Sequence, residues 1–194
     1  MKRLGFDLIL LGDPTAGKDT QAALLMKQYL MKPVESGKHW AKLAARRDKI
    51  GKMLAKTFRL GKPAPVNLMK KFLQNQLSHL PANKDLIFIG NPRLKPEAQL
   101  LSKLLNNACR NFFAIYIRLP EAEIRKRSEL RMRDDQDIRY VQNRIKYHRI
   151  QVSKTALYLE HMGKLKYVNG NQPIKKVHAD VIKIINAYQR SKRN

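Results

Sequence analysis

Short apolar runs alternate along the chain with longer stretches in which apolar residues recur every three or four positions. The runs at 8–11, 86–89 and 112–117 are wholly apolar, which is typical of strands buried between two layers of helices. A last, shorter strand is predicted at 166–168. Helical spacing predicts helices at 18–32, at 40–58 with a break near Gly51 and a stop at Gly61, from about 66 to 80, at 96–108, in two long basic stretches within 120–162, and at 174–188.

This alternation of strands and helices predicts an α/β fold, with a parallel sheet covered by helices on both faces. In such a sheet the ligand binds at the carboxyl ends of the strands. The length of 194 residues favours one domain with a small insertion, and 43% hydrophobic residues are enough to form its core.

The first apolar run ends in a glycine-rich loop. Gly12 is followed by four residues and then by Gly17 and Lys18, which is the spacing of a phosphate-binding loop. Backbone N–H groups at the start of the next helix attract a phosphate, the glycines let the main chain approach it, and Lys18 can reach the terminal phosphates. Asp19 occupies the usual Ser/Thr position, and the hydroxyl follows at Thr20.

The charge exceeds what one nucleotide requires, because forty Lys and Arg residues against fifteen Asp and Glu residues give a formal net charge of +25. Between 38 and 84 the only acidic residue is Asp48. Such a surface attracts nucleic acid without base specificity. The alternative is a solvated surface in a protein from an organism with a basic proteome, and the sequence favours neither interpretation.

A single cysteine, Cys109, excludes an internal disulfide, fits a reducing cytoplasm and is predicted to be a packed thiol. The apolar run near the N-terminus is short, contains Asp7 and leads into the phosphate loop, so neither an export signal nor a membrane span is expected. The five histidines show no metal-binding spacing and are interpreted as surface or packing residues.

Several ungapped segments resemble the adenylate kinase family of nucleoside monophosphate kinases. The loop ending Gly-Lys-Asp-Thr-Gln-Ala at 17–22 is similar to the family's Gly-Lys-Gly-Thr-Gln-Ala, and 34–38 falls on the family's segment beside the monophosphate base. The segment 90–93 followed by Pro-Glu-Ala at 96–98 resembles the family's Asp-Gly-Phe-Pro-Arg and Pro-Gln-Ala. Further positions in the family's frame are Gly51, Gly61, Lys62, Arg127, Arg131, Arg133, Asp135, Arg144 and the loop 169–173.

The resemblance implies a P-loop three-layer α/β/α fold with a central parallel sheet, a small helical monophosphate-binding insertion and a minimal lid. It implies a single, monomeric domain at 1–194, with its core at 1–33, 85–125 and 140–194, its insertion at 34–70 and its lid at about 127–137. Only Met132 separates Arg131 from Arg133, which leaves no room for the usual lid hairpin. The helices that carry the arginines on either side of the lid would then have to close the site themselves. Water entering the site would allow ATP hydrolysis as a side reaction.

The resemblance also implies roles for individual residues, since phosphoryl transfer depends on positioning and charge neutralisation. The expected catalytic residues are Lys18, Arg93, Arg127, Arg133 and Arg144. ATP would be bound by Gly12, Pro14, Ala16, Gly17, Lys18, Asp19, Thr20, Arg127 and Gln172. The monophosphate would be bound by Ser36, Gly37, Lys62, Ala64, Gly90, Arg93, Glu97, Arg133 and Arg144. No residue is expected to bind Mg²⁺ directly, and Thr20 and Asp13 are candidates through water.

The acceptor half departs from the family at four positions. Ala41 replaces an arginine that binds the acceptor phosphate, and a hydrogen bond to a charged group is worth roughly 1.5–3 kcal/mol. Unless Lys38 or Lys42 compensates, affinity for the monophosphate would fall about tenfold to a hundredfold. Lys38 itself replaces an aspartate, Ile89 replaces the aspartate that orients the waters of magnesium, and Glu97 replaces the glutamine that reads adenine.

The sequence therefore predicts a cytoplasmic kinase that uses ATP and Mg²⁺ and transfers the γ-phosphoryl group to AMP, giving two ADP, or to a related monophosphate. A kinase for another base is suggested by Glu97 alone. The alternative is a catalytically weakened ATP-binding homologue whose basic surface binds RNA or ribosomes.

Overall fold

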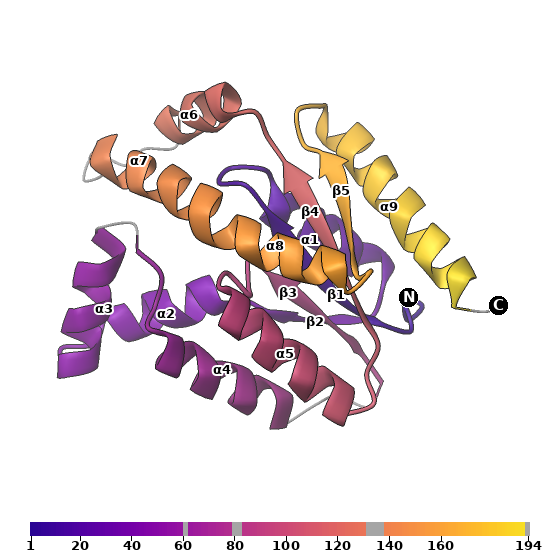
Figure 1. Cartoon of the computed structure of the whole chain (residues 1–194), viewed down its shortest axis with the longest axis horizontal. Helices are drawn as coiled ribbons and strands as arrows, with labels where there is room; N and C mark the ends of the chain where they lie inside the picture. Colours follow the sequence, from indigo (N-terminus) through magenta and orange to yellow (C-terminus); the bar gives the residue numbers. More distant parts are fainter. Residues whose placement is uncertain (60–61, 79–82, 131–137, 193–194) are drawn as a thin grey trace.

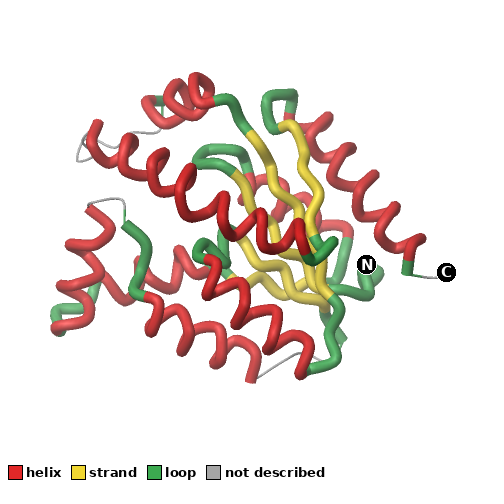
Figure 2. Tube along the Cα trace, in the orientation of Figure 1, coloured by secondary structure: helices red, strands yellow, loops and turns green. Residues whose placement is uncertain are grey.

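The computed structural model describes residues 1–59, 62–78, 83–130 and 138–192 (Figure 1). All five strands of its central sheet run parallel. Their spatial order is β2 (Met31–Val34), β3 (Asp85–Ile89), β1 (Asp7–Gly12), β4 (Phe112–Arg118) and β5 (Leu165–Asn169). Helices lie on both faces of the sheet (Figure 2), which confirms the predicted three-layer α/β/α fold.

Alternation along β1 divides the core into two layers. Leu8 and Leu10 pack on one face with helices α1 (Lys18–Gln28) and α9 (Ile174–Ser191). Ile9 and Leu11 pack on the other face with α4 (Val66–Ser78), α5 (Lys95–Asn107) and α8 (Ser153–His161). Because side chains point to opposite faces with a period of two, a strand covered by helices on both sides must be apolar throughout.

The second strand was missed by the sequence analysis, which extended the first helix to residue 32. The helix ends at Gln28, and 31–34 form the edge strand β2. Pro33 has no backbone N–H to donate, and this excludes it from a helix interior. An edge strand tolerates a proline, because one side of its backbone has no partner strand.

The predicted break near Gly51 was also misplaced. Helix α2 (Ser36–Ala44) ends before α3 (Lys49–Arg59), and Gly51 lies inside α3. A Cβ atom at Gly51 would overlap the backbone of Arg46, so the glycine permits a close approach between the two helices. Helices α2, α3 and α4 cover most of the segment predicted as an insertion at 34–70 and extend past it to Ser78, and we call these three helices the helical insertion (Figure 1).

The described residues of this region, 121–130 and 138–161, form three helices and one π-helical turn. They are α6 (Glu121–Glu129), α7 (Ile138–Tyr147), the π-helical turn η1 (His148–Val152) and α8. The predicted lid at 127–137 lies largely outside the described residues, as do Arg131, Arg133 and Asp135. Cys109 follows α5 in a left-handed conformation and is exposed, so the predicted packed thiol was wrong. No described helix is long and apolar enough to cross a membrane.

The amino end of the sheet is held by a buried carboxylate. Asp7 accepts hydrogen bonds from Nε and Nη2 of Arg110, at 2.7 and 2.5 Å, and from the backbone N–H of Leu86 at 2.7 Å. Its side chain is 1% exposed. Removing one partner of a buried ion pair leaves the other charge uncompensated.

Asp7→Ala should therefore lower the free energy of unfolding by about 3 kcal/mol or more. Denaturation by urea, followed by circular dichroism, measures the change. Glu121→Ala is the matched control, because Glu121 pairs with Arg125 and Arg149 at the surface, where ion pairs contribute less than about 1 kcal/mol. Equal losses in the two variants would contradict the assignment.

Candidate active site

The loop between β1 and α1 is shaped to receive phosphate but is closed on itself in this structure. Gly12 and Gly17 both have a positive φ, at 155° and 81°. A Cβ at Gly12 would lie 2.5 Å from the carbonyl oxygen of Ile117, so only glycine fits beside β4. Nζ of Lys18 donates to the carbonyl oxygens of Gly12 and Asp13, at 2.9 and 2.6 Å. A bound phosphate would offer this ammonium group an alternative partner.

Asp13 anchors the loop to the neighbouring strand. One carboxylate oxygen accepts the hydroxyl of Tyr116 and the other accepts the backbone N–H of Leu119, both at 2.7 Å. A role for Asp13 in holding a water of Mg²⁺ would have to compete with these bonds. Asp19 and Thr20, at the start of α1, each line a cavity beside the loop, and their oxygen atoms fit a magnesium ion held mainly by phosphates and water.

A cavity adjoins this loop at the carboxyl edge of the sheet. It has a volume of about 570 Å³ and is lined by Pro14, Thr15, Ala16, Gly17, Lys18, Asp19, Glu35, Gly37, Lys38, Ile89, Gly90, Arg93, Ser128, Val141 and Arg144. Nε of Arg93 donates to the carbonyl oxygen of Gly90 at 2.9 Å, which fixes the guanidinium at the end of β3. Arg144 arrives from α7. We call this cavity the phosphate chamber.

A second cavity of about 360 Å³ opens from the insertion. Its lining comprises Ser36, Gly37, Trp40, Ala41, Phe58, Lys62, Pro63, Ala64, Met69, Arg93, Glu97 and Arg144. Oε2 of Glu97 accepts the backbone N–H groups of Arg93 and Leu94, at 2.8 and 3.2 Å. Oε1 is buried without a hydrogen-bond partner among the described residues, and burial raises the pKa of this carboxyl group. We call this cavity the acceptor pocket.

A third cavity, the donor pocket, lies on the other side of the loop. It has a volume of about 290 Å³ and is lined by Thr15, Ala16, Gly17, Thr20, Gln21, Arg127, Gly170, Gln172, Pro173, Ile174 and Val177. Arg127 is paired with Glu123 at 2.6 Å. Arg127 lines this cavity and not the phosphate chamber, and its expected role at the transferred phosphoryl group stays a prediction.

The phosphate chamber lies between the other two cavities and shares lining residues with each of them. Thr15 and Gly17 line both the donor pocket and the phosphate chamber. Arg93 and Arg144 line both the phosphate chamber and the acceptor pocket. Such an arrangement can bring two nucleotides together with their phosphates meeting at the cationic centre.

Comparison with known proteins agrees with this geometry. A sequence model of adenylate kinase matches residues 10–164. The chain belongs to the adenylate kinase family. Adenylate kinases of Brucella ovis and Brucella canis are each 26% identical to it over 189 residues, covering 92% of this chain and 97% of the relative. Membership in this family supports nucleoside monophosphate kinase activity, a phosphoryl transfer, while the identity is too low to decide the substrate.

In this adenylate kinase family member, most of the predicted site residues line the three cavities. Gly12 borders a smaller cavity beside Lys18, and Arg133 lies outside the described residues. His148 was not among the predicted site residues. It lies one helical turn after Arg144, and that spacing of four residues on one helix face was the available signal.

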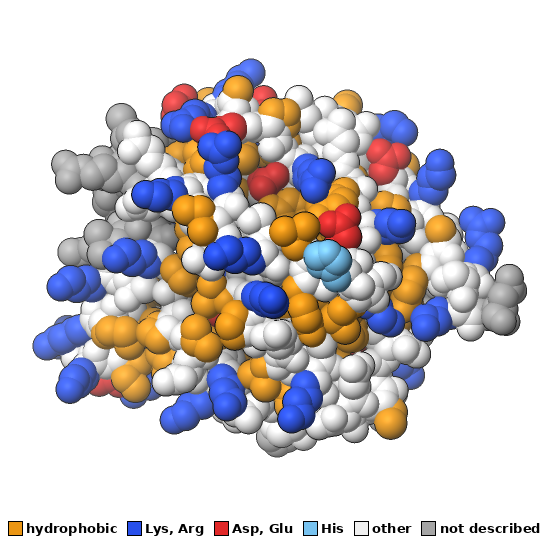
Figure 3. Space-filling view, viewed as in Figure 1, with side chains coloured by type: hydrophobic (Ala, Val, Ile, Leu, Met, Phe, Trp, Pro, Cys, Tyr) orange, Lys and Arg blue, Asp and Glu red, His pale blue; other side chains and the backbone are white. Residues whose placement is uncertain are grey.

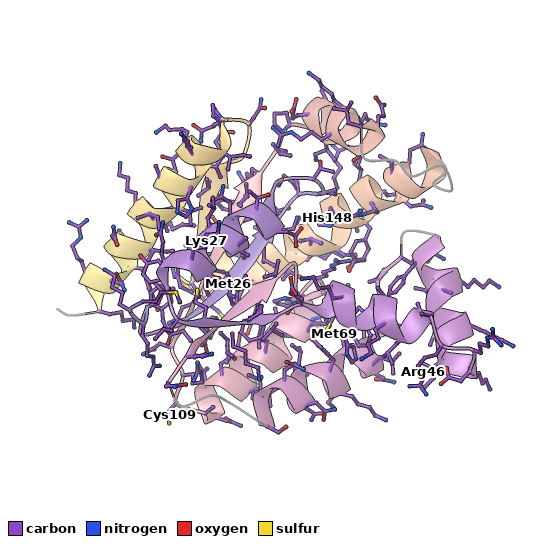
Figure 4. The ribbon with its side chains drawn as sticks, turned by 180° about the vertical axis from the view of Figure 1, so that it is seen from behind. Met26, Lys27, Arg46, Met69, Cys109 and His148 are labelled. Carbon is purple, nitrogen blue, oxygen red and sulfur yellow. The ribbon has the colours of Figure 1, made fainter. Side chains whose placement is uncertain are left out.

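His148 is 8% exposed and begins the π-helical turn η1 (Figure 4). With Lys18, Arg93 and Arg144 it lines a cavity of about 20 Å³, room for one water molecule. Its Nδ1 atom is buried without a hydrogen-bond partner in the described part of the chain. Burial, followed by the charges of Lys18, Arg93 and Arg144, lowers the pKa of His148 to about 2, so the imidazole is neutral.

The same crowding acts on Lys18. Burial, followed by the charges of Arg144 and Arg93, lowers its pKa to about 7. Phosphates of a bound nucleotide favour the ammonium form and would raise that pKa. Below pH 7 the lysine is already charged in the free protein, whereas above pH 7 nucleotide binding must be accompanied by proton uptake.

ATP affinity should therefore fall as the pH rises above 7, by up to about tenfold per pH unit. Calorimetry between pH 6 and 9 measures this, and buffers of different ionisation enthalpy report the proton uptake. In Lys18→Arg the cation stays charged throughout, so any pH dependence that remains belongs to ATP itself. Affinity that stays constant up to pH 9 in the unmodified protein would contradict the assignment.

His148→Lys should destabilise the free protein, because a fourth cation would lie beside Lys18, Arg93 and Arg144 at the cavity of about 20 Å³. We expect its melting temperature to fall by about 5 °C or more, given roughly 2–4 °C per kcal/mol for a domain of this size. His148→Gln keeps a neutral hydrogen-bonding group and is the control. ATP should restore much of the loss in His148→Lys, and equal melting temperatures for the two variants without ATP would contradict the electrostatic argument.

Proposed function

We propose that the chain transfers the γ-phosphoryl group of ATP to AMP or a related nucleoside monophosphate. The observation that carries the proposal is the cationic phosphate chamber, which adjoins the donor pocket through Thr15 and Gly17 and the acceptor pocket through Arg93 and Arg144. A nucleotide in each cavity would direct its phosphates to Lys18, Arg93 and Arg144. Mg²⁺, arriving with ATP, would neutralise further charge on the donor phosphates.

The expected mechanism is positioning followed by charge neutralisation. The loop amides and Lys18 hold the donor phosphates, once the nucleotide has drawn Lys18 from the carbonyl groups of Gly12 and Asp13. Arg93 holds the acceptor phosphate, and Arg144 lies where both cavities meet. Donors fixed in advance around the transferred group stabilise its transition state without reorganisation.

The acceptor side has weaker support than the donor side. Ala41 lines the acceptor pocket without a side-chain charge, and Lys38 reaches the phosphate chamber while paired with Glu35 at 2.7 Å. Lys38 is therefore a better candidate than Lys42 to compensate for the missing arginine. The base that the acceptor pocket accepts also depends on Glu97. AMP is proposed because the chain belongs to the adenylate kinase family, whereas a carboxyl group at this position can select another base.

The test is a coupled assay of transfer from Mg-ATP to AMP, CMP, UMP, GMP and dTMP. We expect turnover with at least one acceptor and a loss of about a hundredfold or more in kcat/KM for Lys18→Ala. Lys27→Ala, an exposed residue on the same helix, is the matched control and should leave the rate unchanged. No turnover with any acceptor, despite measurable ATP binding, would refute the kinase proposal.

A further inference from the structure

Positive charge is concentrated in the helical insertion. Residues 36–78 contain eleven Lys and Arg residues and a single acid, Asp48, a formal net charge of +10 within the chain's +25. The described Lys and Arg side chains of this segment are all exposed. In Figure 3 basic side chains line the lower left of the molecule, over the insertion, while most visible acidic ones lie in the upper half.

Little of this charge is neutralised within the described residues. Asp48 pairs with Arg46 at 2.5 Å and accepts the backbone N–H of Gly51 at 2.8 Å, so the only acid of the segment is already engaged at the start of α3. Lys38 pairs with Glu35. The remaining described cations of α2, α3 and α4 have no ion pair in this part of the chain.

Helix α3 presents the charge as a stripe. Lys49, Lys52 and Lys56 are spaced by three and four residues, so they share one helix face and extend along it for about 10 Å. The opposite face of α3 packs against the rest of the protein, because Leu54 is fully buried and Phe58 lines the acceptor pocket. The stripe therefore points away from the core.

The chemistry of this face favours a phosphate backbone over two other partners. Insertion into a bilayer would require an exposed apolar helix face, but the apolar face of α3 with Leu54 is packed inward, and its exposed large apolar side chains are Ile50 and Met53, at 43% and 38%. A stable protein interface would require an apolar or aromatic centre, and Trp40 is buried. Repeated lysine point charges suit repeated phosphates, which need no base contacts.

We propose that the outer face of α2 and α3 binds the phosphate backbone of a nucleic acid without reading its sequence. Exposed cations continue from this face to the cavities, since Lys38 lines the phosphate chamber and Lys62 the acceptor pocket. Lys49, Lys52 and Lys56 line none of the three cavities assigned to phosphoryl transfer, so binding to this stripe does not depend on catalysis.

The test compares two charge-reversal variants with the same change in net charge. Lys49, Lys52 and Lys56 are changed to Glu in one. The other carries Lys175→Glu, Lys183→Glu and Arg190→Glu on α9, at the opposite side of Figure 1. Binding of a 20-nucleotide oligouridylate with a 5′-hydroxyl is measured by fluorescence anisotropy over a range of salt concentrations. Circular dichroism and ATP affinity establish that each variant is folded.

We expect the α3 variant to lose at least tenfold in affinity. The slope of log affinity against log salt concentration should become shallower by about 2, because each of the three lost phosphate contacts contributes about 0.7. The α9 variant should lose less than about threefold, because it changes only the overall field. Equal losses in both variants would overturn the proposal and leave a diffuse charge effect. If the triple α3 variant does not fold, Lys52→Glu and Lys56→Glu are tested singly against Lys183→Glu.

Two further ligands test whether the partner is instead a membrane or an acidic protein. Phosphatidylserine vesicles and polyglutamate are titrated against the same proteins at physiological ionic strength. If either binds more tightly than the oligonucleotide and depends on α3, the nucleic-acid proposal is refuted in favour of a membrane or an acidic protein. None of these readouts requires kinase turnover, so the proposal and the kinase function fail independently.

Discussion

The site depends on the convergence of three partly buried cations. Lys18, Arg93 and Arg144 repel one another, and partial burial weakens the screening of their charges by solvent. Two features limit this repulsion: Lys18 donates to backbone carbonyl groups, and the neighbouring His148 stays neutral. A polyphosphate would add negative charge beside the three cations, so relief of their repulsion would contribute to nucleotide affinity.

The parallel sheet brings these charges together from distant parts of the chain. The carboxyl ends of β1 and β3 are adjacent, which places the phosphate loop beside Gly90 and Arg93. Asp13 fastens that loop to β4 through Tyr116 and Leu119, more than a hundred residues away. Rigid strands thus hold the loop and Arg93, while α7 supplies Arg144. A site divided in this way can close by moving helices without disturbing the phosphate loop.

Arg93 and Glu97 were assigned largely through the family resemblance. Local signals were sufficient for β1, β3, β4, β5 and the phosphate loop, because each depends on short spacings that adjoining elements enforce. They were insufficient for β2, whose Pro33 is acceptable only because the strand lies at the sheet edge. They also missed the tether through Asp13 and the burial of His148, since both depend on contacts between segments remote in sequence. The division into core, insertion and lid stays a prediction.

Glu97 links the choice of acceptor base to protonation. Its Oε2 atom is held by two backbone N–H groups, so only Oε1 is left to meet a ligand. When ionised, Oε1 can only accept a hydrogen bond, which suits a base with a ring N–H and disfavours the unprotonated ring nitrogen of adenine. When protonated, it can donate as a glutamine amide does. Because burial raises the pKa of this carboxyl group, the protonated form persists to higher pH than in water, and the hydrogen-bonding character of the acceptor pocket changes with that single proton.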